Sequence, residues 1–124
     1  HSPNEVPDLI AQLQVLAASD VAALVRPAWS DPVLIKRILD AGAQSLLVPY
    51  IQTPVTAADA VRATRYPPGG IRGVSSGSRA AGYGQTADYL RTADDQICVL
   101  VQIETPRALD NLEAIAATPG IDGI

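Results

Sequence analysis

Short apolar runs of strand length alternate along this chain with longer segments whose apolar residues recur at helical spacing. Apolar residues three or four positions apart predict an amphipathic helix, whereas a continuous run of about four to eight predicts a buried strand. Helices are expected at residues 6–18, 32–41, 56–65, 86–93 and 106–118, and strands at 21–26, 44–48 and 97–104, with another beginning at 121–124. This alternation predicts an α/β fold with a parallel sheet.

Capping and turn residues mark several of the expected boundaries. Asp31 precedes a proline and is placed to cap the second helix, and Gly42 follows that helix where a left-handed residue is favoured. Thr56 and Asp59 are spaced like a capping pair for the third helix. Residues 66–84 are rich in Gly, Pro and Ser and are expected to form a long loop.

Two α/β architectures fit this order, a doubly wound sheet and a (β/α)₈ TIM barrel. The sequence lacks the glycine-rich phosphate loops that are typical of nucleotide-binding sheets. A complete barrel needs about 250 residues, whereas this chain has 124. We therefore expect residues 1–124 to form one partial TIM-barrel domain, truncated at both ends. A half-barrel that closes by dimerisation is the less favoured alternative.

Composition excludes several kinds of partner. The formal net charge is −4, and the nine basic residues are scattered, so no nucleic-acid partner is expected. No stretch approaches the roughly 20 apolar residues that span a bilayer, so no membrane association is expected. The single cysteine, Cys98, lies in an apolar run and is expected to be a buried small hydrophobe. Without an internal disulfide, a cytoplasmic location is the natural expectation.

Polar residues stand at the expected carboxyl ends of two strands, the edge where parallel barrels carry their active sites. Gln102 and Glu104 are two apart and should project from one face, and Arg26 ends an earlier strand. Glu104 has two open interpretations: a ligand for a hard divalent cation, or a salt-bridge or helix-cap residue beside Thr105. Arg26 is either functional or a surface residue at a loop, and Trp29 is expected to be a packing residue.

Several motifs, taken in order, resemble the HpcH/HpaI aldolase family. The first, His1-Ser-Pro-Asn4, is similar to the family's His-Ala-Pro-Asn segment. The others are Val25–Trp29, Asp31–Lys36, Leu39–Ala43, Leu47–Pro49, Arg62–Pro68, Gly70–Val74 and Cys98–Thr105. Together they cover essentially the whole chain, and the resemblance places it at about strands 3 to 5, with the start of strand 6, of the family's barrel.

The resemblance also implies roles for individual residues. His1 matches the general base, and Asp40 matches the acid that raises the basicity of that histidine. Arg26 matches the residue that binds substrate and stabilises the developing enolate, Gln102 matches a substrate contact, and Glu104 matches a metal ligand. From its position alone, Asp40 would be only a helix-end residue. The family's second carboxylate ligand follows the next strand, in a Pro-x-Asp-Leu motif that this sequence does not reach.

The activity implied by the resemblance is the metal-dependent cleavage of a 4-hydroxy-2-oxo acid. One such substrate is 4-hydroxy-2-oxoheptanedioate, which would give pyruvate and succinate semialdehyde. The expected cofactor is Mg²⁺ or Mn²⁺, with Co²⁺ a further option, and the expected assembly is a homo-oligomer, a hexamer or a trimer. Lys36 is expected in mid-helix, which disfavours a Schiff-base mechanism.

Three alternatives to that activity remain open: a 2-keto-3-deoxy sugar acid aldolase, a lyase of the citrate-lyase or malyl-CoA type, and an inactive barrel fragment. The loop at residues 75–84 departs from the family's pattern. We expect that loop near the mouth of the site, where it would affect the choice of aldehyde.

Overall fold

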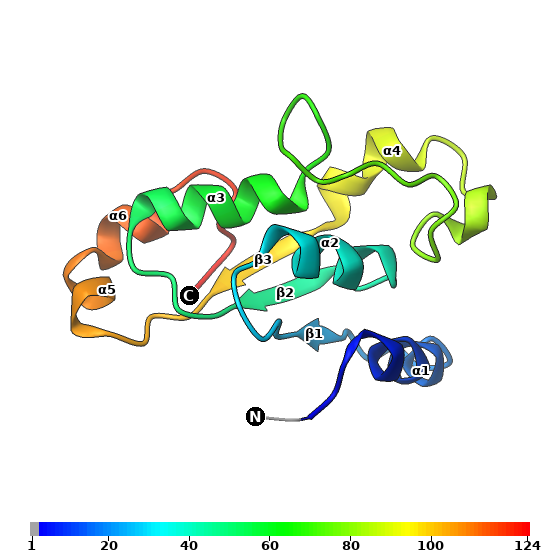
Figure 1. Cartoon of the computed structure of the whole chain (residues 1–124), viewed down its shortest axis with the longest axis horizontal. Coiled ribbons are helices and arrows are strands. Elements are labelled where there is room, and N and C mark those ends of the chain that lie inside the picture. The colour runs from blue at the N-terminus through cyan, green and yellow to red at the C-terminus, as the bar shows by residue number, and fades with distance from the viewer. Residues whose placement is uncertain (1–2) are drawn as a thin grey trace.

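Three parallel strands form the centre of the chain in the computed structural model, which describes residues 3–124. They are β1 (Leu24–Val25), β2 (Ser45–Val48) and β3 (Cys98–Val101), in that spatial order. Leu24 pairs with Ser45, which in turn pairs with Cys98, so the strands begin at the same edge (Figure 1). The predicted α/β fold with a parallel sheet is confirmed.

The last residues of the chain continue this sheet beyond β3. A parallel bridge joins Leu100 to Gly123, and the Val101 amide donates to the Gly123 carbonyl over 3.1 Å. The Asp122 carboxylate accepts a further bond from the Val99 amide at 2.7 Å. The expectation that a new strand begins at 121–124 agrees with this pairing.

Helices connect the strands and return the chain from the carboxyl edge of the sheet to the amino edge. The main helices are α1 (Val6–Leu16), α2 (Pro32–Asp40), α3 (Pro54–Thr64), α5 (Pro106–Asp110) and α6 (Leu112–Ala116). A single-turn helix, α4 (Tyr89–Thr92), lies between two short 3₁₀ segments, η1 (Gly82–Gly84) and η2 (Ala93–Gln96). All helices in residues 3–124 are too short to cross a lipid bilayer.

The two faces of the sheet differ in burial. Leu46, Val48, Val99 and Val101 are fully buried in a core that also holds the apolar sides of α2 and α3. The residues that alternate with them face the other way and remain partly or largely exposed, and they are Leu24, Ser45, Leu47, Cys98 and Leu100. We call the face that carries this second set the open face of the sheet. Because side chains alternate between the two faces of a strand, residues two positions beyond Leu24 or Leu100 also point to the open face.

Two of the helices differ from the sequence expectation. The third helix begins earlier, because Thr53 caps α3 and exchanges hydrogen bonds with Thr56 in the first turn; the predicted pair of Thr56 with Asp59 was wrong. The helix predicted at residues 106–118 is split at Asn111, whose side-chain amide donates to the carbonyl of Arg107. A side-chain donor competing for a helical carbonyl accounts for this break.

The strands are also shorter than their apolar runs. The first run was expected to pair over residues 21–26, but only Leu24–Val25 does so, against β2 alone. The third run was expected to extend to Glu104, but β3 ends at Val101. Gln102 and Glu104 therefore lie in the segment that follows β3. Their side chains are less restricted in orientation there than they would be within the hydrogen-bonded sheet.

Candidate functional site

Arg26, Gln102 and Glu104 come together at the carboxyl edge of the sheet. Arg26 follows β1, and its Nε donates to Oε1 of Gln102 over 2.5 Å. A terminal nitrogen of the same guanidinium lies 3.9 Å from Oε1 of Glu104. Arg26 is two residues after Leu24, and Gln102 is two residues after Leu100, so both side chains lie on the open face of the sheet. The structure thus gathers three of the predicted site residues on the open face.

Glu104 is partly accessible and has a defined orientation. Its side chain is 36% exposed, and Oε2 accepts a hydrogen bond from the backbone amide of Tyr50 at 2.8 Å. It does not cap the following helix, because the Thr105 hydroxyl accepts the Ala108 amide at 3.1 Å. The salt-bridge interpretation and the metal-ligand interpretation are both compatible with this geometry, since Oε1 faces Arg26 and solvent.

An aromatic pair stands beside these polar groups. The rings of Trp29 and Tyr50 lie 5.1 Å apart between centroids, with an interplanar angle of 32°. Trp29 packs against Tyr50, as a packing residue would. Both side chains nevertheless remain accessible, Trp29 at 55% exposure and Tyr50 at 42%. Sequence reasoning missed Tyr50. Its position directly after the proline that ends β2 was the available signal.

Asp40 lies at the other end of the sheet from this cluster. It is the last residue of α2, which runs back from the carboxyl edge, and β2 begins a few residues later. Its carboxylate accepts from Nζ of Lys36 and, at 2.8 Å, from Nη2 of Arg72. Within one chain, Asp40 is therefore not brought together with Arg26. Its predicted catalytic role stays a prediction.

The Asp40 group is a buried network that sequence reasoning did not identify. Arg72 is 1% exposed, and its guanidinium carbon lies 4.4 Å from the centre of the Tyr66 ring. Burial disfavours the charged guanidinium, but the hydrogen bond to Asp40 and the interactions with Tyr66 and Tyr89 together outweigh that effect, so the pKa of Arg72 is raised. Burial likewise raises the pKa of Tyr66 to about 12. In the sequence, Arg72 is an isolated arginine in a glycine-rich segment, and no local pattern predicts its contacts with Asp40 and Tyr66.

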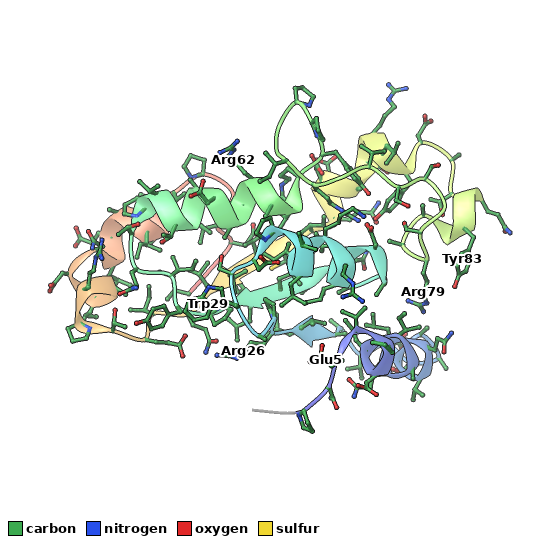
Figure 2. The ribbon with its side chains drawn as sticks, viewed as in Figure 1. Glu5, Arg26, Trp29, Arg62, Arg79 and Tyr83 are labelled. Atoms are coloured by element: carbon green, nitrogen blue, oxygen red, sulfur yellow. The ribbon has the colours of Figure 1, made fainter. Side chains whose placement is uncertain are left out.

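The long loop after α3 packs against this buried network. Arg79 donates to the Ala41 carbonyl at 2.8 Å, and the Ala80 amide donates to the Asp40 carbonyl at 3.1 Å. Figure 2 shows Arg79 and Tyr83 towards one end of the molecule, away from Arg26 and Trp29, which lie nearer its middle. The expectation that residues 75–84 lie near the mouth of the site is wrong within one chain, because α3 carries the backbone away from that edge.

An open groove runs beside Arg26 between α1 and β1. It has a volume of about 690 Å³, and Asn4, Glu5, Val25 and Arg26 are among its lining residues. Glu5 and Arg26, both labelled in Figure 2, line the same groove. The predicted general base, His1, lies outside the described residues. Asn4 and Glu5, which line the groove, follow it in the sequence.

The site offers hard oxygen donors to a divalent cation. The Glu104 carboxylate is the kind of ligand that Mg²⁺ or Mn²⁺ prefers, and the Gln102 amide oxygen accepts from Arg26, the same arginine that faces Glu104. No cluster of three or more histidine, cysteine, aspartate or glutamate side chains with the arrangement of a metal site occurs in residues 3–124. The described chain thus fits a cation through one carboxylate, and the other ligands would have to come from outside it.

Cys98 has the properties of an unreactive thiol. Burial, with a smaller contribution from the Asp122 carboxylate, raises the pKa of its thiol. A higher pKa lowers the fraction of thiolate, the nucleophilic form. The side chain is half-buried rather than fully buried, because it belongs to the open face of the sheet.

Comparisons with known proteins match the chain over its whole length. The model of the HpcH/HpaI aldolase/citrate lyase family covers residues 1–124. A pyruvate aldolase from Rhizobium etli is 54% identical over 124 residues, which are 100% of this chain and 49% of the relative. A 4-hydroxy-2-oxo-heptane-1,7-dioate aldolase from Klebsiella pneumoniae is 53% identical over 125 residues, which cover 100% of this chain and 47% of the relative.

A crystal structure gives the same result for the fold. A family protein from Burkholderia cenocepacia superimposes with a TM-score of 0.95 at 48% sequence identity, over 98% of this chain and 50% of that one. The described sheet and helices therefore form a segment of the (β/α)₈ barrel, as predicted. The chain spans about half the length of the curated relatives it matches.

Proposed function

Because this chain belongs to the HpcH/HpaI aldolase/citrate lyase family, we propose that the protein carrying it is a metal-dependent pyruvate aldolase. The observation that carries the proposal is the convergence of Arg26, Gln102 and Glu104 at the carboxyl edge of a parallel sheet. In barrels of this kind, that edge carries the active site. The names of the similar proteins from Rhizobium etli and Klebsiella pneumoniae support the same reaction class.

The proposed reaction is a retro-aldol cleavage of a 4-hydroxy-2-oxo acid. A base removes the proton of the C4 hydroxyl, the C3–C4 bond breaks, and its electron pair moves onto C3 and the 2-oxo group as an enolate. Protonation at C3 then gives pyruvate, and C4 leaves as an aldehyde. With 4-hydroxy-2-oxoheptanedioate the aldehyde is succinate semialdehyde. His1 is proposed as the base, and Asp40 as the acid that supports it.

Each described residue of the site has a proposed part in this reaction. Arg26 places a fixed positive charge where the enolate oxygen becomes negative, and it anchors the substrate with Gln102. Glu104 would hold the divalent cation, Mg²⁺, Mn²⁺ or Co²⁺, together with ligands from outside the described residues. When bound, such a cation would supply Lewis-acid stabilisation of the enolate. A homo-oligomer is the proposed assembly.

The test uses the full-length protein and a coupled assay for pyruvate. We expect pyruvate release from 4-hydroxy-2-oxo acids, loss of release when a chelator removes metal, and recovery when Mg²⁺ or Mn²⁺ is returned. Glu104→Gln should remove most of the activity, whereas the exposed Glu113→Gln on α6 should retain it. A covalent adduct trapped by borohydride with pyruvate would overturn the metal mechanism.

The same assay separates the remaining candidates by substrate. Faster turnover of 2-keto-3-deoxy sugar acids would assign the sugar-acid aldolase activity. Cleavage of CoA thioesters with no reaction of free 2-oxo acids would assign the citrate-lyase type. No turnover of any of these substrates by the full-length protein would contradict the proposal altogether.

A further inference from the structure

The backbone between β2 and α3 makes a short excursion that aims one amide at Glu104. The Gln102 amide donates to the Val48 carbonyl at 2.9 Å, and the Gln102 carbonyl accepts from the Ile51 amide at 3.3 Å. Pro49 and Tyr50 lie between these two tethers. Val48 and Ile51 both bond to Gln102, so Pro49 and Tyr50 have no residue opposite them on the neighbouring segment. The backbone therefore bends outward at these two residues, as it does in a β-bulge.

Tyr50 accommodates the bend in a conformation that side chains rarely adopt. Its φ is +60°, in the left-handed region that Asn and Gly tolerate far better than tyrosine. Pro49 has no N–H, so the Tyr50 amide is the only backbone donor between the tethers. That amide lies 2.8 Å from Oε2 of Glu104.

Contacts on both sides hold Tyr50 in place. Its ring contacts Trp29, 5.1 Å away in the loop after β1, while its amide bonds to the segment after β3. The residue therefore links the loops of three successive strands (Figure 2 labels Trp29 and Arg26 in the first of them). With Oε2 held by the amide, Oε1 is the oxygen directed to Arg26, 3.9 Å away.

We infer that Tyr50 is a positioning residue whose left-handed backbone orients the Glu104 carboxylate for its ligand. The inference rests on the proposed function for the identity of that ligand. Tyr50 acts through its amide, and its phenol is not required. The backbone conformation at position 50 should therefore matter more than the side chain.

Three substitutions at this position separate backbone from side chain. Tyr50→Asn and Tyr50→Gly lose the ring but tolerate a positive φ, whereas Tyr50→Val loses the ring and strongly resists it because Val is β-branched. In the full-length protein we expect Tyr50→Val to weaken Mn²⁺ binding about tenfold, or about 1.4 kcal/mol, because a β-branched side chain resists the left-handed conformation more strongly than tyrosine does. Tyr50→Asn and Tyr50→Gly should stay within about threefold of the parent.

Activity gives a second measurement that a folding defect would not reproduce. The pyruvate-forming kcat of Tyr50→Val should fall at low Mn²⁺ and recover when Mn²⁺ is saturating. Equal losses in all three variants would assign the effect to the ring and overturn the inference. So would wild-type Mn²⁺ affinity in Tyr50→Val.

A further variant, which keeps the ring, tests the inference even if Tyr50→Val does not fold. Replacing Tyr50 by its α-hydroxy analogue turns the Pro49–Tyr50 amide into an ester, which replaces the N–H donor by an oxygen and keeps the ring. We expect the same loss of Mn²⁺ affinity as in Tyr50→Val; no change would overturn the inference.

Crystals of the metal-free protein separate this inference from the proposed function. Glu104 should stay on the residue 50 amide in the parent and in Tyr50→Asn, and should leave it in Tyr50→Val. If the parent bound no Mn²⁺ but showed this pattern, the metal proposal would fail and the positioning role would stand. If the carboxylate kept its position in all variants, the positioning role would fail whatever the metal result.

Discussion

Two arginine–carboxylate pairs occupy opposite ends of the same parallel sheet, and they are built differently. At the carboxyl edge, the side chains of Arg26 and Glu104 are 30% and 36% exposed, and their charged atoms are 3.9 Å apart. At the amino edge, those of Arg72 and Asp40 are 0% and 17% exposed and only 2.8 Å apart. Lys36 also bonds to Asp40. Accessible charges can exchange partners with a ligand, whereas a buried network stabilises one conformation.

The largest effect is expected from breaking the buried pair. Arg72→Ala leaves Asp40 with Lys36 alone and opens a cavity beside Tyr66, so we expect a loss of about 3–5 kcal/mol in the free energy of unfolding. Denaturant unfolding of the full-length protein measures it. Arg62→Ala is the matched control, because that side chain is 56% exposed and its ion pair lies on the surface; its loss should stay below about 1 kcal/mol. Equal losses would erase the contrast between the two ends.

Removing the exposed arginine should affect catalysis instead of stability. We expect Arg26→Ala to lower kcat by about 10²–10³, which corresponds to about 2.7–4 kcal/mol of lost charge stabilisation. The free energy of unfolding should change by less than about 1 kcal/mol. Arg26→Lys should fall between the two proteins, since Lys keeps the charge but lacks the planar fork. An unchanged kcat in Arg26→Ala would remove this residue from the mechanism.

Alkaline pH should weaken the buried end selectively. Burial raises the pKa of Tyr66 to about 12, from an ordinary value of 10.0. The folded state therefore holds this proton more tightly than the unfolded state does. The resulting stabilisation is complete below pH 10 and is lost as the pH rises towards 12, and it amounts to about 2–3 kcal/mol. Phenolate absorbance and unfolding curves against pH measure both quantities. Tyr66→Phe should lack this part of the pH dependence; an ordinary Tyr66 pKa would contradict the prediction.

The smallest expected effect concerns the exposed carboxylate. Glu104→Gln should change the free energy of unfolding by less than about 1 kcal/mol, because a partly solvated ion pair contributes little. Asp40→Asn should lose more, since it leaves Lys36 and the buried Arg72 without their anion. Thermal unfolding of the two variants side by side makes this comparison. Glu104 would prove to be a structural residue if its replacement destabilised the protein as strongly as that of Asp40.

The sequence predicted the exposed end of the molecule better than the buried end. Arg26, Gln102 and Glu104 follow apolar strands, and parallel pairing brings such positions to one edge, so their proximity could be foreseen. The contacts of Arg72 could not, because they depend on how an irregular loop folds back onto α2. Local patterns carry no information about such long-range packing.

The same distinction explains the errors at individual elements. An apolar run indicates where a strand can form, but the strand ends where its hydrogen-bonded pairing with the neighbouring strand ends. For this reason β3 stops at Val101. The conformation of Tyr50 was invisible for a related reason, since it results from tethers to a segment about 50 residues away. Asp40 was joined to the site by resemblance alone, and the geometry of one chain separates the two.

The open face of the sheet gives the chain a built-in chemical probe. Cys98 is the only cysteine in the sequence, and its half-buried side chain belongs to that face. Any segment or subunit that covers the face must shield this sulfur from alkylating reagents. The labelling rate of the Cys98 thiol, followed by mapping the modified residue, therefore reports whether that face of the sheet is covered.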